Sequence, residues 1–172
     1  MSPTWVYGDS DKDPPITDDT RICEFQSKIG SLNFYSQCTR PDISYAVGTL
    51  CRHLHNPNEN CFKALRHLMC YMAHTPHLGL VYHSPFTSSL RVENYLFEDD
   101  TSKQPPLDLE AYSDSNYTGH DPTNAKSTTG NLIFFAGALI AWSSSLQPTI
   151  ATSSAEAEYT AAYDTSRYII YF

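Results

Sequence analysis

The sequence predicts an α+β protein in which a small helical bundle comes first and an antiparallel sheet with one helix comes second. Three observations lead to this prediction. Between residues 20 and 76, apolar residues recur at steps of three and four, which is the spacing of one helix face. Between residues 107 and 143, apolar residues form short extended runs bounded by turn residues. Residues 154–172 return to a helical pattern rich in small residues.

The N-terminal end and the first helix differ sharply in composition. Residues 1–19 predict a flexible leader, because they carry three prolines and five aspartates with little apolar periodicity. The first helix is expected from Thr20, where apolar residues begin to fall on one face of an amphipathic helix. That face consists of Ile22, Phe25, Ile29 and Leu32.

Two further helices are expected, and together with the first they make a bundle over residues 20–83. The second begins at Pro41, because proline is favoured at the first helical position, and ends at Asn56-Pro57. The third follows Asn58, a capping residue, and stops at Thr75-Pro76. The apolar faces are Ile43, Ala46, Val47, Leu50 and Leu54 in the second helix, and Cys61, Leu65, Leu68 and Met72 in the third.

After Gly79 the pattern becomes extended. Residues 80–82 and 90–97 predict strands, and residues 98–106 are acidic and contain proline. We therefore expect residues 84–106 to form a strand-containing linker, with a domain boundary near its end.

The second half predicts one strand, then a hairpin and then a helix. Residues 107–115 predict the first strand. Residues 131–135 and 138–143 predict a hairpin that turns at Ala136-Gly137. Residues 154–172 predict the closing helix.

The composition indicates in which part of the cell the protein works and whether it binds a membrane. No apolar run approaches the roughly eighteen residues of a membrane-spanning helix, and the N-terminus is not a basic-then-apolar signal. The five cysteines are odd in number and lack a compact spacing, so we expect reduced, mostly buried thiols. These features predict an intracellular protein, cytoplasmic and/or nuclear, that is not secreted and binds no membrane.

The charge is unevenly distributed. The net charge of −8 argues against strong nonspecific nucleic-acid binding by the whole chain, because Lys and Arg supply most of that affinity. Residues 21–91 nevertheless hold seven Lys or Arg against three Asp or Glu. Such an excess is most often a solvated helical surface, which leaves its meaning open.

Asp114 is the first candidate for chemistry. It follows an apolar and aromatic run and precedes a turn that contains glycine, so it should lie at the end of a strand, with its side chain free to enter a cleft. The alternative is an aspartate that starts the turn by bonding its own backbone. On this segment alone the turn-starting aspartate is the favoured interpretation, so the functional one depends on other residues.

Two glutamates on the last helix can be separated by helix geometry. With Ser153 as the N-cap, Glu156 takes the third helical position, where its side chain reaches back to the amide of the cap. Glu158 lies about 200° further around the helix, on a face shared with small residues that should approach the sheet closely. A carboxylate on a buried face is costly unless it is paired, protonated or bound to a metal, so Glu158 is the functional candidate. The face shared with Glu158 is Ala161, Ala162, Thr165 and Ile169.

A second possible metal site lies on the third helix. His67, Cys70 and His74 share one face, with His77 just beyond. Structural zinc sites need four ligands in a closed tetrahedral set, and no second ligand pair is evident. Ordinary packing is the favoured interpretation of these side chains.

Several ordered motifs together resemble one family, the polyproteins of copia-type LTR retrotransposons, at the junction between reverse transcriptase and ribonuclease H. The resemblance runs from about Phe25 to the end of the chain. In the first half the motifs are residues 29–32 (IGSL), 39–47 (TRPDISYAV), 55–57 (HNP) and 64–68 (ALRHL). In the second half they are residues 112–114 (YSD), 126–130 (KSTTG), 142–144 (WSS), 147–149 (QPT) and 153–159 (SSAEAEY).

The resemblance implies a fold and a chemistry for each half. Residues 21–83 would be the thumb or connection of the polymerase, which grips the template-primer duplex, and residues 107–172 would begin a ribonuclease H-like domain. Asp114 and Glu158 would then be the first two carboxylates that hold catalytic Mg²⁺, or Mn²⁺, for cleavage of RNA in an RNA–DNA hybrid. Such a hybrid is recognised by backbone shape and 2′-hydroxyl groups. The residues that we expect to make those contacts are Ser115, Asn116 and Lys126.

Departures from the family pattern limit the expected activity. The polymerase palm is absent, Asn116 stands where the family usually has Asp, and the later ribonuclease H carboxylates are not among these residues. We therefore expect a fragment of the polyprotein that binds Mg²⁺ weakly, is inactive alone and has the remainder of the polyprotein as its partner. The alternative is a domesticated, non-catalytic module that contacts nucleic acid or protein, with self-association through an exposed sheet edge.

Overall fold

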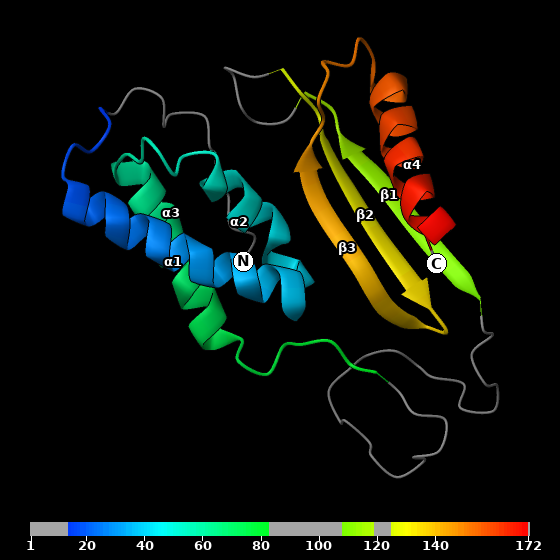
Figure 1. The fold of residues 1–172 in the computed structure, drawn as a ribbon, viewed down its shortest axis with the longest axis horizontal. Coiled ribbons are helices and arrows are strands. Elements are labelled where there is room, and N and C mark those ends of the chain that lie inside the picture. Colours follow the sequence, from blue (N-terminus) through cyan, green and yellow to red (C-terminus); the bar gives the residue numbers. More distant parts are fainter. Residues whose placement is uncertain (1–13, 83–107, 119–124, 172) are drawn as a thin grey trace.

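The computed structural model describes residues 14–82, 108–118 and 125–171, and it confirms the α+β class (Figure 1). Helices from the first half of the chain pack together beside an antiparallel sheet, and the last helix covers part of that sheet. The elements are α1 (Asp19–Cys38), the 3₁₀-helix η2 (Pro41–Ile43), α2 (Ser44–Cys51), α3 (Glu59–His74), β1 (Leu109–Asn116), β2 (Thr128–Phe135), β3 (Ala138–Leu146) and α4 (Ser154–Tyr171).

The bundle is built on the expected apolar stripes. Asp18 caps α1 by accepting a hydrogen bond from the amide of Thr20 (3.0 Å), and Asn58 caps α3 through the amide of Cys61 (3.0 Å). Fully burying one large apolar side chain contributes about 1.5–3 kcal/mol, so this cluster is the main stabilising feature of the first half. Its buried members are Phe25, Ile29, Leu32, Ile43, Val47, Leu50, Cys61, Leu65 and Leu68.

The second helix is shorter than expected. Pro41 opens a 3₁₀ turn rather than an α-helix, and α2 ends at Cys51, so Leu54 lies beyond it. The amides of Arg52, His53 and Leu54 bond the carbonyls three residues before them, which tightens the chain into a turn. Leu54 still packs against the core, and its carbonyl accepts a hydrogen bond from Gln26 Nε2 (2.9 Å).

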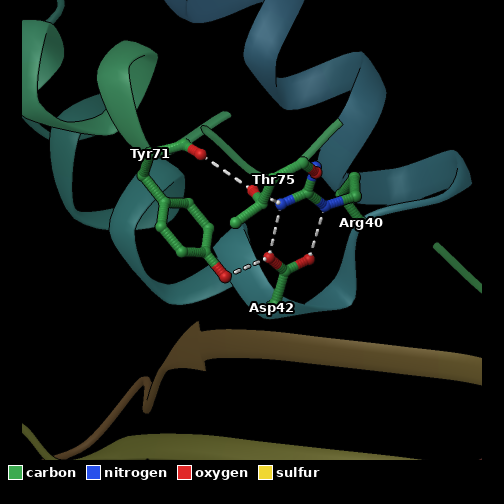
Figure 2. Close-up of polar contacts among 4 residues, drawn as sticks. All are labelled: Arg40, Asp42, Tyr71 and Thr75. Atoms are coloured by element: carbon green, nitrogen blue, oxygen red, sulfur yellow. Dashed lines mark hydrogen bonds and ion pairs between the residues drawn. The ribbon is translucent and has the colours of Figure 1, made fainter. Parts of the chain in front are cut away.

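A polar cluster joins η2 to the end of α3 (Figure 2). Arg40, only 5% exposed, donates to both carboxylate oxygens of Asp42 (2.9 and 2.8 Å) and to the carbonyl and hydroxyl of Thr75 (3.0 and 2.8 Å). The hydroxyl of Tyr71 donates to Asp42 (2.9 Å). Each of these charged groups is therefore satisfied, as buried charges must be.

The sheet has the order β1-β2-β3, and all neighbours are antiparallel. The hairpin between β2 and β3 turns at Ala136 and Gly137, as the sequence predicts, and both residues have positive φ (50° and 75°). Two consecutive positive φ values suit the right-handed twist of the flanking strands.

The two faces of the sheet meet different partners. Thr129 faces α4, because Gln147 Nε2 bonds both Thr129 Oγ1 (3.0 Å) and the carbonyl of Ala157 in α4 (2.9 Å). Trp142 faces the bundle, and its indole N–H donates to the carbonyl of Ser36 in α1 (2.7 Å). Side chains alternate between the two faces along β1 and β2, and along β3 from Ala141 onward, because a bulge at Ile140 shifts the β2–β3 register.

Other expectations have mixed outcomes. Residues 80–82 form no strand; instead the Tyr82 hydroxyl donates to the carbonyl of Leu139 (3.0 Å). The predicted strand 90–97, the linker 84–106 and most of the predicted leader 1–19 lie outside the described residues. All five cysteines are free, but only Cys61 is buried, so the expectation of mostly buried thiols is wrong.

None of the helices in the described part of the chain has the length and hydropathy to cross a membrane.

Candidate metal and nucleic-acid site

Asp114 lies near the end of β1, the strand at one edge of the sheet. Its partner on β2 is Gly130, so the register places it on the face opposite Thr129 and α4. Its side chain is exposed. Among the described elements, the carboxylate can therefore meet a group on α4 only around the outer edge of β1.

Glu156 is occupied in capping α4. The amide of Glu156 bonds Ser153 Oγ (3.2 Å), and its carboxylate accepts from the amide and hydroxyl of Thr152 (2.6 and 2.7 Å). These bonds to Thr152, first from its side chain and then from its backbone, lower the pKa of Glu156. The carboxylate of Glu156 thus accepts from the amide of Thr152, one residue before the amide of Ser153 that the sequence predicted.

Glu158 is exposed, so the expectation that it shares the buried face of α4 is wrong. The buried face is Ala157, Ala161 and Thr165. At 100° per residue, Glu158 lies about 60° from the centre of this face at Ala161, and Glu156 lies about 140° away on the other side. Ala162 and Ile169, expected on the buried face, are exposed on the same flank as Glu158.

The flank of α4 that carries Glu158 overhangs the edge of β1. The opposite flank lines a pocket with Asn131 on β2 and with Ser143 and Ser145 on β3. With the strand order β1-β2-β3, the flank of Glu158 therefore points past β1, where the described sheet ends. Nothing in the described sheet lies under this flank, which explains its exposure. The pocket residues on α4 are Asp164, Arg167, Tyr168 and Tyr171.

Several candidate side chains therefore lie at one end of the sheet, which we call the carboxylate end. It is the end where β1 finishes and β2 starts, beside the first turns of α4 (Figure 1). Asp114 and Asn116 belong to the last residues of β1, and Glu158 lies in the second turn of α4. In the described part of the chain, no three His, Cys, Asp or Glu side chains are grouped closely enough to hold a metal ion. Among the described side chains at this end, the carboxylates of Asp114 and Glu158 are not engaged in capping, unlike that of Glu156.

The three residues expected to contact nucleic acid differ in their exposure to solvent. Asn116 is exposed at the tip of β1, opposite Thr128, and Lys126 precedes β2 by two residues with a half-buried side chain. Ser115 faces α4, and its hydroxyl oxygen is buried without a hydrogen-bond partner among the described residues. Asn116 and Lys126 are thus the two whose side chains reach the surface.

The histidines of α3 lie on its solvent face. His67, Cys70 and His74 are all exposed, and His74 Nδ1 lies 2.7 Å from the carbonyl of Cys70. Lys63 and Arg66 share this face, one turn earlier. The side chains thus make a basic surface rather than the packed one that the sequence favoured.

A buried polar network, which pattern analysis missed, connects the two carboxylate-bearing segments. The amide of Thr118, just after β1, donates to Ser127 Oγ (3.3 Å), and the carbonyl of Ser127 accepts from the amide of Gln147 (2.8 Å). The side chain of Gln147 then reaches Thr129 and Ala157. The motif at residues 147–149 marks Gln147 in the sequence but does not reveal this role, because its partners come from two other elements.

Comparison with known proteins places the chain among transposon-encoded polyproteins. It is 34% identical over 147 residues to the retrovirus-related Pol polyprotein from transposon TNT 1-94 of Nicotiana tabacum, covering 86% of this chain and 10% of that protein. It is 36% identical over 151 residues to the Pol polyprotein from transposon RE1 of Arabidopsis thaliana, covering 88% and 9%. The chain thus spans about a tenth of these relatives. It belongs to the copia-type retrotransposon Pol polyprotein family.

One shorter relative is matched over most of its length. The chain is 31% identical over 137 residues to the secreted RxLR effector protein 161 of Plasmopara viticola, covering 80% of this chain and 82% of that protein. No protein-family model matches the chain, and no solved structure matches it.

Proposed function

We propose that this chain is the part of a copia-type polyprotein where the reverse transcriptase connection meets a ribonuclease H-like domain, and that its carboxylate end holds a divalent cation against an RNA–DNA hybrid. The observation that carries the proposal is the placement of Asp114 and Glu158. One carboxylate lies two residues before the end of the edge strand β1, and the other lies on the flank of α4 that points past the same edge. Oxygen ligands of this kind suit Mg²⁺ and Mn²⁺.

Other groups support contact with a nucleic-acid backbone. Lys126 and Asn116 flank the carboxylate end and could bind phosphate or 2′-hydroxyl groups. On α3, Lys63, Arg66 and His67 form a basic face suited to phosphates of a duplex, in agreement with the thumb-like role implied by the family. The remainder of the polyprotein would be the natural partner, and the five free cysteines agree with a reducing intracellular compartment.

Weak ion binding without cleavage is the expected behaviour of residues 1–172. Two carboxylates can hold one hydrated Mg²⁺, which keeps most of its waters in any case. They cannot fix a second ion about 4 Å away to stabilise both the attacking and the leaving oxygen, and that second ion supplies much of the rate.

The test is a Mn²⁺ titration followed by electron paramagnetic resonance, together with cleavage of a labelled RNA–DNA hybrid. We expect Asp114→Asn and Glu158→Gln each to weaken Mn²⁺ binding, while Glu156→Gln, the matched control on the same helix, binds like the wild type. Loss of binding in Glu156→Gln but not in Glu158→Gln would reverse the assignment. Hybrid cleavage by the wild type that disappears in both site variants would refute the expected inactivity.

The second candidate function is a non-catalytic interaction module. It is favoured by the edge of β1, which has a strand neighbour on one side only within the described residues, and exposed edges recruit further strands. Equal Mn²⁺ binding by the wild type and both site variants, combined with a dimer in analytical ultracentrifugation, would favour this function over the first.

A further inference from the structure

We infer that Gln147 is a positioning residue that sets the location of the first turn of α4, and with it Glu158, on the sheet. The inference rests on the proposed function for its consequence, metal binding, but the contacts of Gln147 exist without it. Gln147 is 2% exposed. Its side-chain amide nitrogen donates one hydrogen bond to Thr129 in β2 and one to Ala157 in α4.

The geometry makes Gln147 the link between the candidate ligands. Ala157 precedes Glu158 in the chain, so fixing the carbonyl of Ala157 fixes the turn from which Glu158 projects. Thr129 pairs across the sheet with Ser115, the neighbour of Asp114. The backbone amide of Gln147 donates to the carbonyl of Ser127, so the backbone of Gln147 is fixed on the sheet independently of its side chain.

The burial of this residue argues for a positioning role over a purely stabilising one. Gln147 Oε1 is buried and has no hydrogen-bond partner among the described residues, and neither has the nearby Ser115 Oγ. Burying an unpaired polar atom costs free energy, so an apolar side chain of similar size removes that cost, which offsets part of what is lost when Ala157 and Thr129 lose their N–H donor. Leucine has no N–H donors, so it cannot make the two hydrogen bonds that hold the first turn of α4 on the sheet.

The test compares Gln147→Leu with Thr165→Val in the full chain. Thr165 is also buried on α4, but its hydroxyl bonds only Ala161 within the helix, so its loss removes a polar group without touching the sheet. Amide hydrogen exchange, thermal unfolding and Mn²⁺ affinity are measured for both variants and the wild type.

We expect Gln147→Leu to speed exchange in the first two turns of α4 by about tenfold relative to its last turn, a local effect beyond any fall in melting temperature, which both ends of the helix share. Mn²⁺ affinity should fall by about tenfold or more, as it does when a group that orients a metal ligand is lost. Thr165→Val should leave both the exchange of the first turn and the affinity unchanged.

Two results would overturn the inference. One is unchanged exchange in the first turns of α4 in Gln147→Leu; the other is faster exchange with Mn²⁺ affinity equal to that of a wild type that binds Mn²⁺. If the wild type itself binds no Mn²⁺, the proposed metal function fails, and the exchange measurement alone decides whether Gln147 positions the helix.

Discussion

At the scale of single residues, Asp42 gives the clearest pH-dependent prediction. Burial alone would raise the pKa of Asp42, but hydrogen bonds from Arg40 and then Tyr71 outweigh burial and hold this pKa below its ordinary value. A lowered pKa means that the stabilisation is present above the unfolded value, near about 3.9, and is lost as the pH falls through the lower folded value. We therefore expect Asp42→Asn to destabilise the protein at pH 7 and to approach the wild type in stability as the pH falls below about 4.

The size of the effect follows from burial. Removing one partner of a buried ion pair costs about 3–5 kcal/mol, and because the Asp42 side chain keeps 26% exposure we expect about 2 kcal/mol, measured by urea unfolding. The control is Glu59→Gln, which breaks the more exposed pair with Arg21 and should change stability much less. A difference between Asp42→Asn and wild type that stays constant with pH would contradict the argument. The sequence did not predict this cluster, because Tyr71 and Thr75 join it only once α3 packs beside η2.

At the scale of elements, the backbone of the β2–β3 turn is strained at Ala136, and a substitution there can relieve the strain. Ala136 has φ of 50°, and a residue with a Cβ pays about 1 kcal/mol or more in this left-handed region. Asparagine followed by glycine is the preferred pair for such a turn. We expect Ala136→Asn to raise the free energy of unfolding by about 0.5–1 kcal/mol, and Gly137→Ala to lower it by a similar amount, in chemical denaturation. Equal stability of all three proteins would show that the turn is not left-handed.

The elements that the sequence predicted well are those whose signal is local. α1, α3 and α4 begin within about two residues of their expected starts, because caps and apolar periodicity act within one helix. The hairpin was found from its turn residues. The short α2 was not predictable, because apolar periodicity does not distinguish an α-helix from the tight turn at residues 52–54. The absence of a strand at 80–82 was not predictable either, because Tyr82 bonds Leu139, a distant residue. The flank of Glu158 was misassigned for the same reason, because helix periodicity does not say where the sheet ends.

At the scale of the whole molecule, the bundle and the sheet are joined at β3. Trp142 bonds Ser36, and a methyl group added at Gly48 in α2 would lie 3.6 Å from the carbonyl oxygen of Ser144. The division of the chain near residue 106 remains a prediction. We expect limited proteolysis within residues 98–106 to yield two pieces that still co-elute in gel filtration, because these contacts do not depend on the connecting segment.

The indole hydrogen bond should contribute measurably to that association. Trp142→Phe keeps a ring but loses the N–H donor, so we expect a loss of about 1 kcal/mol and weaker co-elution after cleavage. Tyr112→Phe is the matched control, since its hydroxyl bonds only Glu110, two residues away on the same strand. Undiminished co-elution in Trp142→Phe would mean that the indole hydrogen bond contributes nothing measurable to the association of the two halves.

Ser36 and Trp142 are separated by 106 residues, so they leave the ribosome at different times during synthesis. At about 5–20 residues per second, roughly 5–20 s pass between synthesis of the acceptor and synthesis of its donor. The apolar cluster of the bundle is complete in the chain by Leu68, so the bundle can close well within that interval. β3 would then be delivered to a surface that is already folded, and the third of the described strands would dock on the bundle as it emerges.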